Sequence, residues 1–219
     1  MRILITGAAS GIGLACVHHF QTHQITAIDK VLLDLNDTDA VNQYSHLLED
    51  YDVFIHCAGV REITPPHQLT IEEWQTVFNV NVNSAFIISQ ALIKKALINK
   101  TPLNIIHIAS VAGLQAEPDR AAYVASKFAL IGLTKQLAYQ YGKNNIRVNA
   151  IAPGIIETPM TQQYFADPTK AEQIKNGIPV GYWGDTKHIV SLVEICLLNT
   201  YLNGSVLVCD GGWTVGRNI

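Results

Sequence analysis

Short, continuously apolar segments alternate with longer helical patterns along almost the whole of this 219-residue chain. The apolar segments have the length and β-branched content of buried strands, and they are Ile3–Thr6, Ile25–Asp29, Val53–His56, Asn104–Ala109, Arg147–Ile151 and Ser205–Cys209. The helical patterns lie near residues 12–22, 37–49, 70–99, 121–142 and 185–199. Strands without a polar face belong to a parallel sheet that helices cover on both sides. We therefore predict an α/β fold with a single doubly wound, Rossmann-like domain over residues 1–219.

One connection is too short for this architecture. Only four residues separate Asp29, at the end of the second strand, from Asp34. A parallel crossover needs about a dozen residues, and four residues with their flanking bonds reach at most about 18 Å. We therefore predict six parallel strands, with Ile25–Asp29 at an edge. The helix near 37–49 should lead directly into the strand at Val53.

Composition excludes several classes of protein. A net charge of −3 gives no electrostatic reason to expect nucleic acid or an anionic membrane as a partner. No uninterrupted apolar stretch approaches the ~20 residues of a membrane span, and the chain passes from Arg2 straight into a strand, without the pattern of a signal peptide. The four cysteines are scattered, which predicts reduced thiols, a cytoplasmic protein and no metal site.

The long stretch at 155–184 contains no strand pattern and several prolines and glycines. Insertions after the carboxyl end of a strand often form binding loops, so we predict a substrate lid here. Its apolar residues, Met160, Tyr164 and Phe165 among them, are compatible with many substrates and do not identify one.

A glycine-rich turn follows the first strand, with Gly7, Gly11 and Gly13 spaced G-x-x-x-G-x-G. Glycines allow backbone angles closed to other residues and let a phosphate approach the chain. The helix that begins near Ile12 directs unpaired N–H groups and a positive dipole end at such an anion. A turn without a ligand is the plainer interpretation, but its place between a strand and a helix favours a dinucleotide site.

Asp29 ends the second strand sixteen residues after Gly13. An acid at about this distance accepts hydrogen bonds from the adenosine ribose of NAD and repels the extra phosphate of NADP. Ser10 stands where a basic residue could hold that phosphate, although Lys30 is a nearby cation. NAD is therefore the predicted cofactor.

Tyr123 and Lys127 are four residues apart in a helical pattern and share one face of the helix. A nearby ammonium favours phenolate and lowers the pKa of a tyrosine. Such a phenol could exchange a proton with an alcohol or a carbonyl oxygen near neutral pH. By itself the pair is a weak signal, because many helices contain one by chance.

The pair is accompanied by several other segments that occur in the order typical of one family. With them, the chain resembles the short-chain dehydrogenase/reductase family over nearly its full length. Ser110 ends a strand thirteen residues before Tyr123, as in that family. The other matching segments are Thr6–Gly13, the Ala58-Gly59 pair after the third strand, Asn81, Pro153-Gly154 with Thr158, and Asp210-Gly211-Gly212.

The resemblance implies roles for these residues. Tyr123 would be the general acid/base, Lys127 would lower the pKa of Tyr123 and bind the nicotinamide ribose, Ser110 would hold the reacting oxygen, and Asn81 would hold a water in a proton relay. The resemblance implies a cofactor site formed by Gly7, Ser10, Gly11, Ile12, Gly13, Asp29, Asp34, Leu35, Ala58, Gly59, Tyr123, Lys127, Pro153, Gly154, Ile156 and Thr158.

The chain departs from the family pattern in two places. His56-Cys57 replaces an Asn-Asn pair, and we expect His56 to be structural rather than a ligand or a base. The short interval from Asp29 to Asp34 means that the third-strand region of the family is truncated. One wall of the adenine pocket should then be open.

We predict an NAD(H)-dependent oxidoreductase that transfers a hydride between nicotinamide and a secondary alcohol or ketone. Its partners would be a small-molecule substrate and further copies of the chain in a homodimer or homotetramer. One alternative is an NADP-dependent 3-oxoacyl-carrier reductase, which Asp29 disfavours. The other is a non-catalytic, dinucleotide-sensing binding protein, which the presence of both Tyr123 and Lys127 disfavours.

Overall fold

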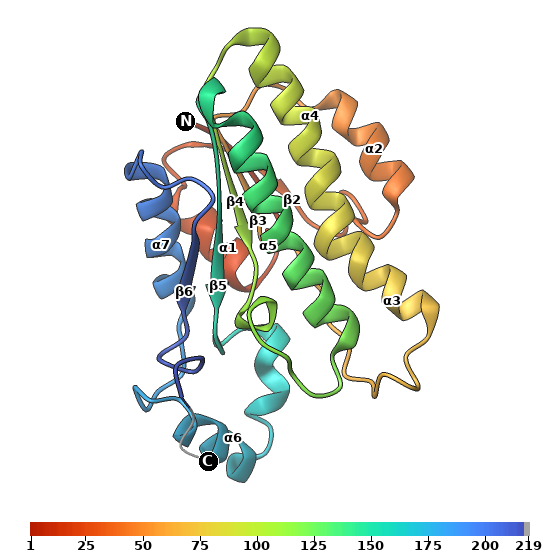
Figure 1. Cartoon of the computed structure of the whole chain (residues 1–219), viewed down its shortest axis with the longest axis vertical. Coiled ribbons are helices and arrows are strands. Elements are labelled where there is room, and N and C mark those ends of the chain that lie inside the picture. Colours follow the sequence, from red (N-terminus) through yellow and green to blue (C-terminus); the bar gives the residue numbers. More distant parts are fainter. Residues whose placement is uncertain (217–219) are drawn as a thin grey trace.

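A computed structural model describes residues 1–216 and contains one sheet of six parallel strands in the order β2-β1-β3-β4-β5-β6 (Figure 1). The strands are β1 (Arg2–Thr6), β2 (Gln24–Ile28), β3 (Val53–His56), β4 (Leu103–Ile108), β5 (Ile146–Pro153) and β6 (Val206–Cys209). Each of the six predicted strands is found, with ends that shift by no more than two residues. The predicted fold class is confirmed. The proposed extent of the domain includes residues 217–219, which lie outside the described part.

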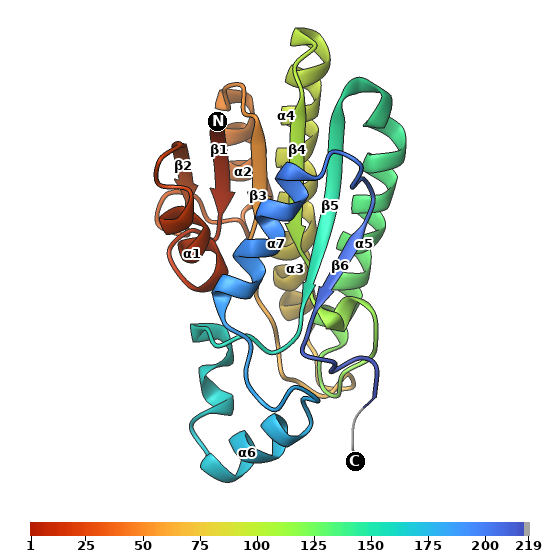
Figure 2. The ribbon, with the colours of Figure 1, turned by 90° about the vertical axis from the view of Figure 1, so that its left-hand side faces the viewer.

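Helices cover both faces of the sheet, as Figure 2 shows most clearly. One face packs against α2 (Thr38–Leu47), α4 (Ser84–Asn99) and α5 (Ala121–Tyr141), and the other packs against α1 (Gly11–His19) and α7 (Thr186–Leu198). Alternate residues of each strand enter the two cores. Leu4 lies in the first core, whereas its neighbours Ile3 and Ile5 lie in the second. Buried strands of this kind have no polar face.

The predicted helix at 70–99 is a continuous run of three elements. These are α3 (Ile71–Phe78), the π-helical turn η1 (Asn79–Asn83) and α4. Thr70 and Glu73 form a capping box at its start. By length and hydropathy alone the run could cross a membrane, but half of its most apolar window is buried inside the protein, as expected of a core helix.

The short interval after β2 is a tight turn. Oδ1 of Asp29 accepts hydrogen bonds from the backbone N–H groups of Val31 and Leu32, and the carbonyl of Asp29 accepts one from Leu33. The chain then enters α2 and continues into β3, on the far side of β1. Within residues 1–216 no strand pairs with the free edge of β2, so the predicted edge position is confirmed.

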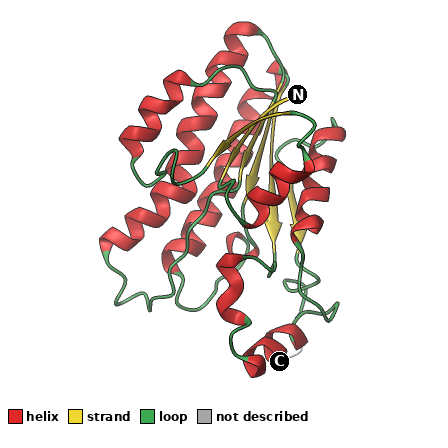
Figure 3. Ribbon diagram, turned by 180° about the vertical axis from the view of Figure 1, so that it is seen from behind, coloured by secondary structure: helices red, strands yellow, loops and turns green. Residues whose placement is uncertain are grey.

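The carboxyl ends of the strands meet a layer of loops and short helices, drawn at the lower end of the molecule in Figure 3. Two short helices, η4 (Pro159–Tyr164) and α6 (Pro168–Asn176), lie in the segment for which the sequence predicted no strand. Of two other short helices, η2 (Val111–Gly113) follows β4 and precedes α5 in the chain, and η3 (Gly142–Asn144) lies between α5 and β5. That 155–184 acts as a lid stays a prediction.

Candidate active site

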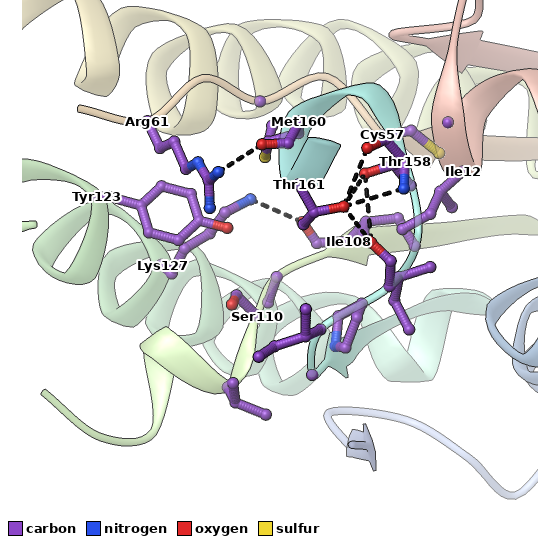
Figure 4. A pocket seen from close by; sticks show the side chains of 18 of the residues that line it. Ile12, Cys57, Arg61, Ile108, Ser110, Tyr123, Lys127, Thr158, Met160 and Thr161 are labelled. Atoms are coloured by element: carbon purple, nitrogen blue, oxygen red, sulfur yellow. Dashed lines mark hydrogen bonds between the residues drawn. The ribbon is translucent and has the colours of Figure 1, made fainter. Parts of the chain in front are cut away.

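A pocket of about 370 Å³ lies at the carboxyl ends of the strands, beneath η4 (Figure 4). It brings together most of the residues that the sequence predicted for catalysis and cofactor binding. Those that line it are Gly7, Ser10, Gly11, Ile12, Gly13, Ala58, Gly59, Ser110, Tyr123, Lys127, Pro153, Gly154, Ile156 and Thr158. Asn81, Asp29, Asp34 and Leu35 are not among its lining residues.

The glycine turn is held against the start of α1 and the end of β3. Gly7 has a φ of +66°, and a Cβ at this position would lie 2.7 Å from the backbone nitrogen of Ala58. A Cβ on Gly13 would lie 2.1 Å from the carbonyl oxygen of Gly7. Any side chain at Gly7 or Gly13 would therefore push these segments apart. Ser10 precedes α1 but makes no side-chain capping bond, so it leaves the N–H groups of the first turn to another acceptor.

The amino end of α5 is fixed by a residue from a distant loop. Arg120 precedes the helix but its side chain does not cap it. The buried carboxylate of Glu62 accepts hydrogen bonds from the backbone N–H groups of Ala122 (2.7 Å) and Tyr123 (3.1 and 3.2 Å) instead. A carboxylate at this end of a helix also interacts favourably with the helix dipole. Glu62 thus sets the position from which Tyr123 projects into the pocket.

Lys127 lies one turn after Tyr123, as predicted, and its ammonium group bonds to the backbone of β4. Nζ donates a hydrogen bond to the carbonyl of Ile108 (2.9 Å) and lies 5.6 Å from the centre of the Tyr123 ring. Burial lowers the pKa of Lys127 to about 8, so the side chain is mostly charged at neutral pH.

The pKa of Tyr123 shifts in the opposite direction to the one that the sequence predicted. Burial raises it above the value of a free phenol, and this effect outweighs the Ser110 hydroxyl, which hydrogen-bonds to the phenol and lowers the pKa. The charge of Glu117 also raises the pKa, and the charges of Arg61 and Arg120 lower it. The sequence led us to expect a lowered pKa, because the spacing of Tyr123 and Lys127 does not show how deeply the phenol is buried.

Asn81 is the fully buried residue of the three asparagines in the π-helical turn. Its amide donates to the carbonyl of Val60 and to the hydroxyl of Ser126, both at 2.9 Å, and its oxygen accepts from the N–H of Val60 at 2.8 Å. A Cβ built on Gly59 would lie 3.5 Å from both Asn81 Oδ1 and Lys127 Nζ. Asn81 therefore braces the pocket wall close to Lys127. A water relay through it stays a prediction.

The far wall of the pocket offers backbone and hydroxyl groups. Ile156 forms a bridge with Gly184 through the carbonyl of Ile155 and the N–H of Glu157. The N–H of Ile156 therefore faces the opposite side, which is the pocket that this residue lines. Thr158 is also among the lining residues. This geometry suits the carboxamide role that the resemblance implies.

The residues predicted for the adenosine half lie outside the pocket. Oδ1 of Asp29 bonds to its own turn, and Oδ1 of Asp34 bonds to the N–H of Asn36. Leu35 is buried in the core against α2 and α4. Their roles toward a cofactor stay predictions.

His56 is fully buried, and its Nδ1 lies 2.9 Å from the hydroxyl of Thr6. Burial, His107 and Lys127 lower its pKa well below the usual value, so the ring is neutral. It does not line the pocket, and the structural interpretation of His56 fits this position.

Sequence reasoning missed a polar cluster on one wall of the pocket. Arg61 donates to the hydroxyl of Tyr164 (2.7 Å) and to the carbonyl of Met160, and Arg120 pairs with Glu117 and also donates to the Tyr164 hydroxyl. These residues come from three separate segments, so no local motif marks them. The one available signal was the place of Arg61, two residues after Gly59.

The chain is similar to known proteins in sequence and in structure. Residues 33–214 match a family model described as enoyl-(acyl carrier protein) reductase. The chain is 31% identical to the 3-oxoacyl-[acyl-carrier-protein] reductase FabG of Thermotoga maritima, over 97% of both chains. It is 34% identical to 2-(R)-hydroxypropyl-CoM dehydrogenase of Xanthobacter autotrophicus, over 96% of this chain and 97% of the relative.

Two solved structures extend the likeness to three dimensions. A 4-hydroxyisoleucine dehydrogenase complexed with NADH has a TM-score of 0.95 and 39% identity over 99% of both chains. A 4-hydroxyisoleucine dehydrogenase complexed with NADH and succinate has a TM-score of 0.89 and 38% identity, over 98% of this chain and 100% of that chain.

The fold and the pocket define a dinucleotide-dependent oxidoreductase. The chain belongs to the short-chain dehydrogenase/reductase family. It is an NAD(P)-dependent enzyme with a small-molecule substrate.

Proposed function

We propose that the protein is an NAD(H)-dependent dehydrogenase of a secondary alcohol or its ketone, with Tyr123 as general acid/base. The observation that carries this proposal is the convergence of Tyr123, Ser110 and Lys127 on the pocket that also contains the glycine turn. When bound, the nicotinamide would accept or donate the hydride.

The residues of this chain would handle the proton. In the oxidative direction the phenolate of Tyr123 takes the hydroxyl proton of the alcohol, and in the reductive direction the phenol returns it to the carbonyl oxygen. Ser110 would hold the same oxygen through its hydroxyl. Arg61 and Arg120 make the phenolate more accessible than burial alone would allow, because both lower the pKa of Tyr123.

The pocket fits a dinucleotide in two respects. The closely packed glycines let a pyrophosphate approach the start of α1, and the N–H of Ile156 faces the region where a carboxamide would lie. NADH rather than NADPH is supported by Asp29 at the end of β2 and by the NADH bound in the 4-hydroxyisoleucine dehydrogenase structures. Lys30 Nζ lies 3.9 Å from the Asp34 carboxylate, which offsets its charge.

A second candidate is reduction of a 3-oxoacyl-carrier thioester with NADPH. The likeness to FabG and the description of the matching family model favour it. The acid at position 29 and the absence of a basic residue at position 10 oppose it.

We propose a homodimer or homotetramer formed through α4 and α5 or through β6. Large apolar side chains are exposed on these elements, including Phe86, Ile98, Phe128 and Val208. We also propose a cytoplasmic location, which the four free thiols support.

A spectrophotometric screen tests the proposed function. Purified protein would be incubated with NAD⁺ and a panel of secondary alcohols, and with NADH or NADPH and the matching ketones and 3-oxoacyl thioesters. We expect NAD(H)-linked turnover of alcohols and ketones. Turnover restricted to NADPH and acyl thioesters would favour the second candidate.

A further inference from the structure

Arg61 is the unusual residue of the pocket wall. It follows β3, is partly buried, and makes its two hydrogen bonds to neutral oxygens, those of Tyr164 and Met160. Within residues 1–216 it forms no ion pair. A guanidinium has five N–H donors, so these two bonds leave donors to spare. Figure 4 shows its side chain reaching into the pocket beside Tyr123.

The pocket that Arg61 lines contains more cationic than anionic side chains. The charged residues that line the pocket are Arg61, Arg120, Lys127 and Glu117. Glu117 forms an ion pair with Arg120, and Lys127 bonds to the backbone beneath the pocket. Burial and the charge of Arg120 lower the pKa of Arg61, Tyr123 and Glu117 raise it, and the net direction is downward, so burial of this cation carries a cost. An anion in the pocket would relieve this cost.

Arg61 is fixed close to the predicted catalytic group. The segment that carries it pairs with the one before α5 through a bridge between Thr64 and Arg120 and a bond from Thr64 N–H to Asp119. Arg61 and Tyr123 interact electrostatically. Both residues line the same pocket.

We propose that Arg61 binds a carboxylate of the substrate, so that the enzyme acts on hydroxy acids and oxo acids. This inference rests on the proposed function and adds the substrate class to it. A planar guanidinium matches a carboxylate through two parallel hydrogen bonds. One end of the substrate would be held there while its hydroxyl or carbonyl lies at Tyr123 and Ser110.

A lid latch is the competing role for Arg61, because Met160 and Tyr164 belong to η4. A latch would act on every substrate alike, whereas an anchor would act only on acids. Tyr164→Phe separates the two roles, since it removes the hydroxyl to which both arginines donate and keeps the charge of Arg61.

The experiment compares acids with neutral amides of the same shape. Wild type, Arg61→Gln, Arg61→Lys and Tyr164→Phe would be assayed for NADH-dependent reduction of 2-oxopentanoate, 4-oxopentanoate and 5-oxohexanoate, and of the three corresponding amides. Binding of the same six compounds to the NADH-loaded protein would be measured by calorimetry, which needs no turnover. Circular dichroism would show whether each variant folds.

We expect at least one acid to bind the wild type and to be reduced with a kcat/KM at least tenfold above that of its amide. Arg61→Gln should lower that value by ten- to a hundredfold for the acid and by less than threefold for the amide, and Arg61→Lys should restore part of it. Tyr164→Phe should keep the preference for the acid.

Two results would contradict the proposal that Arg61 binds a substrate carboxylate. One is equal binding and reduction of acids and amides by the wild type. The other is an equal loss for both in Arg61→Gln, which would assign the residue to the lid. If no ketone of any kind is reduced, the proposed function fails, and charge-dependent binding still decides whether Arg61 recognises a carboxylate.

Discussion

The carboxylate of Glu62 accepts hydrogen bonds from the backbone N–H of Tyr123 at 3.1 and 3.2 Å, across sixty-one residues of sequence. A loop after β3 therefore caps the helix that carries the predicted acid/base. Because the phenol projects from the first turn of α5, its position depends on this cap.

Glu62→Ala should destabilise the protein by about 1–3 kcal/mol, because two buried N–H groups lose their acceptor. It should also lower kcat more than NADH affinity. Glu62→Gln keeps one acceptor and should lie close to wild type in both respects. Urea unfolding and steady-state kinetics measure these effects.

Glu72→Ala is the matched control, since Glu72 is an exposed acid in the first turn of α3, and a change below about 0.5 kcal/mol is expected there. If Glu62→Ala were as stable as this control, the cap would have no energetic role.

The buried ammonium of Lys127 should cost stability. Its pKa falls from 10.5 to about 8 on folding, so the unfolded chain binds this proton more tightly. The cost is fully present below pH 8, at roughly 3 kcal/mol, and disappears as the pH rises toward 10.5. Lys127→Met should therefore raise the melting temperature at pH 7 by several degrees while it reduces turnover and cofactor affinity.

Thermal unfolding from pH 7 to pH 10 tests this prediction. The difference in melting temperature between the variant and wild type should shrink across that range. A constant difference, or a variant that is less stable at pH 7, would show that the ammonium is not under strain in the folded protein.

Asp29 should set the choice of cofactor. We predict that the wild type binds NADH at least tenfold more tightly than NADPH, about 1.4 kcal/mol. Asp29→Ala should narrow this gap because it relieves repulsion of the 2′-phosphate, and Lys30→Ala should widen it slightly. Fluorescence titration of the wild type and the two variants with both cofactors gives the three comparisons. Equal affinities in the wild type would mean that the Asp29 carboxylate serves only its own turn.

Local patterns predicted most of the fold. The strands were recognisable because each is short and mostly apolar, and the edge position of β2 followed from the reach of four residues. The π-helical turn at Asn79–Asn83 within the long helix was not predicted, because no local rule marks it there. The short helices η4 and α6 were also missed, since the stretch was recognised only by its lack of a strand.

The predicted site residues that the structure gathers in one pocket are mostly those whose positions follow from chain order. The glycine turn, Ser110 and Tyr123 each sit at the end of a strand or the start of a helix, so the topology brings them together. Arg61, Glu62 and Tyr164 act through contacts between distant loops, which one sequence does not reveal. The direction of the pKa shift of Tyr123 was predicted wrongly, because helical spacing gives the neighbouring ammonium but not the burial of the phenol.

The most direct test of the account is the Tyr123→Phe variant, assayed for turnover and for NADH binding with a substrate found in the screen. The ring still packs but the proton donor is lost, so we predict NADH affinity within a few-fold of wild type and a fall in kcat of at least a hundredfold. Turnover near that of wild type would contradict the central claim that Tyr123 transfers the proton.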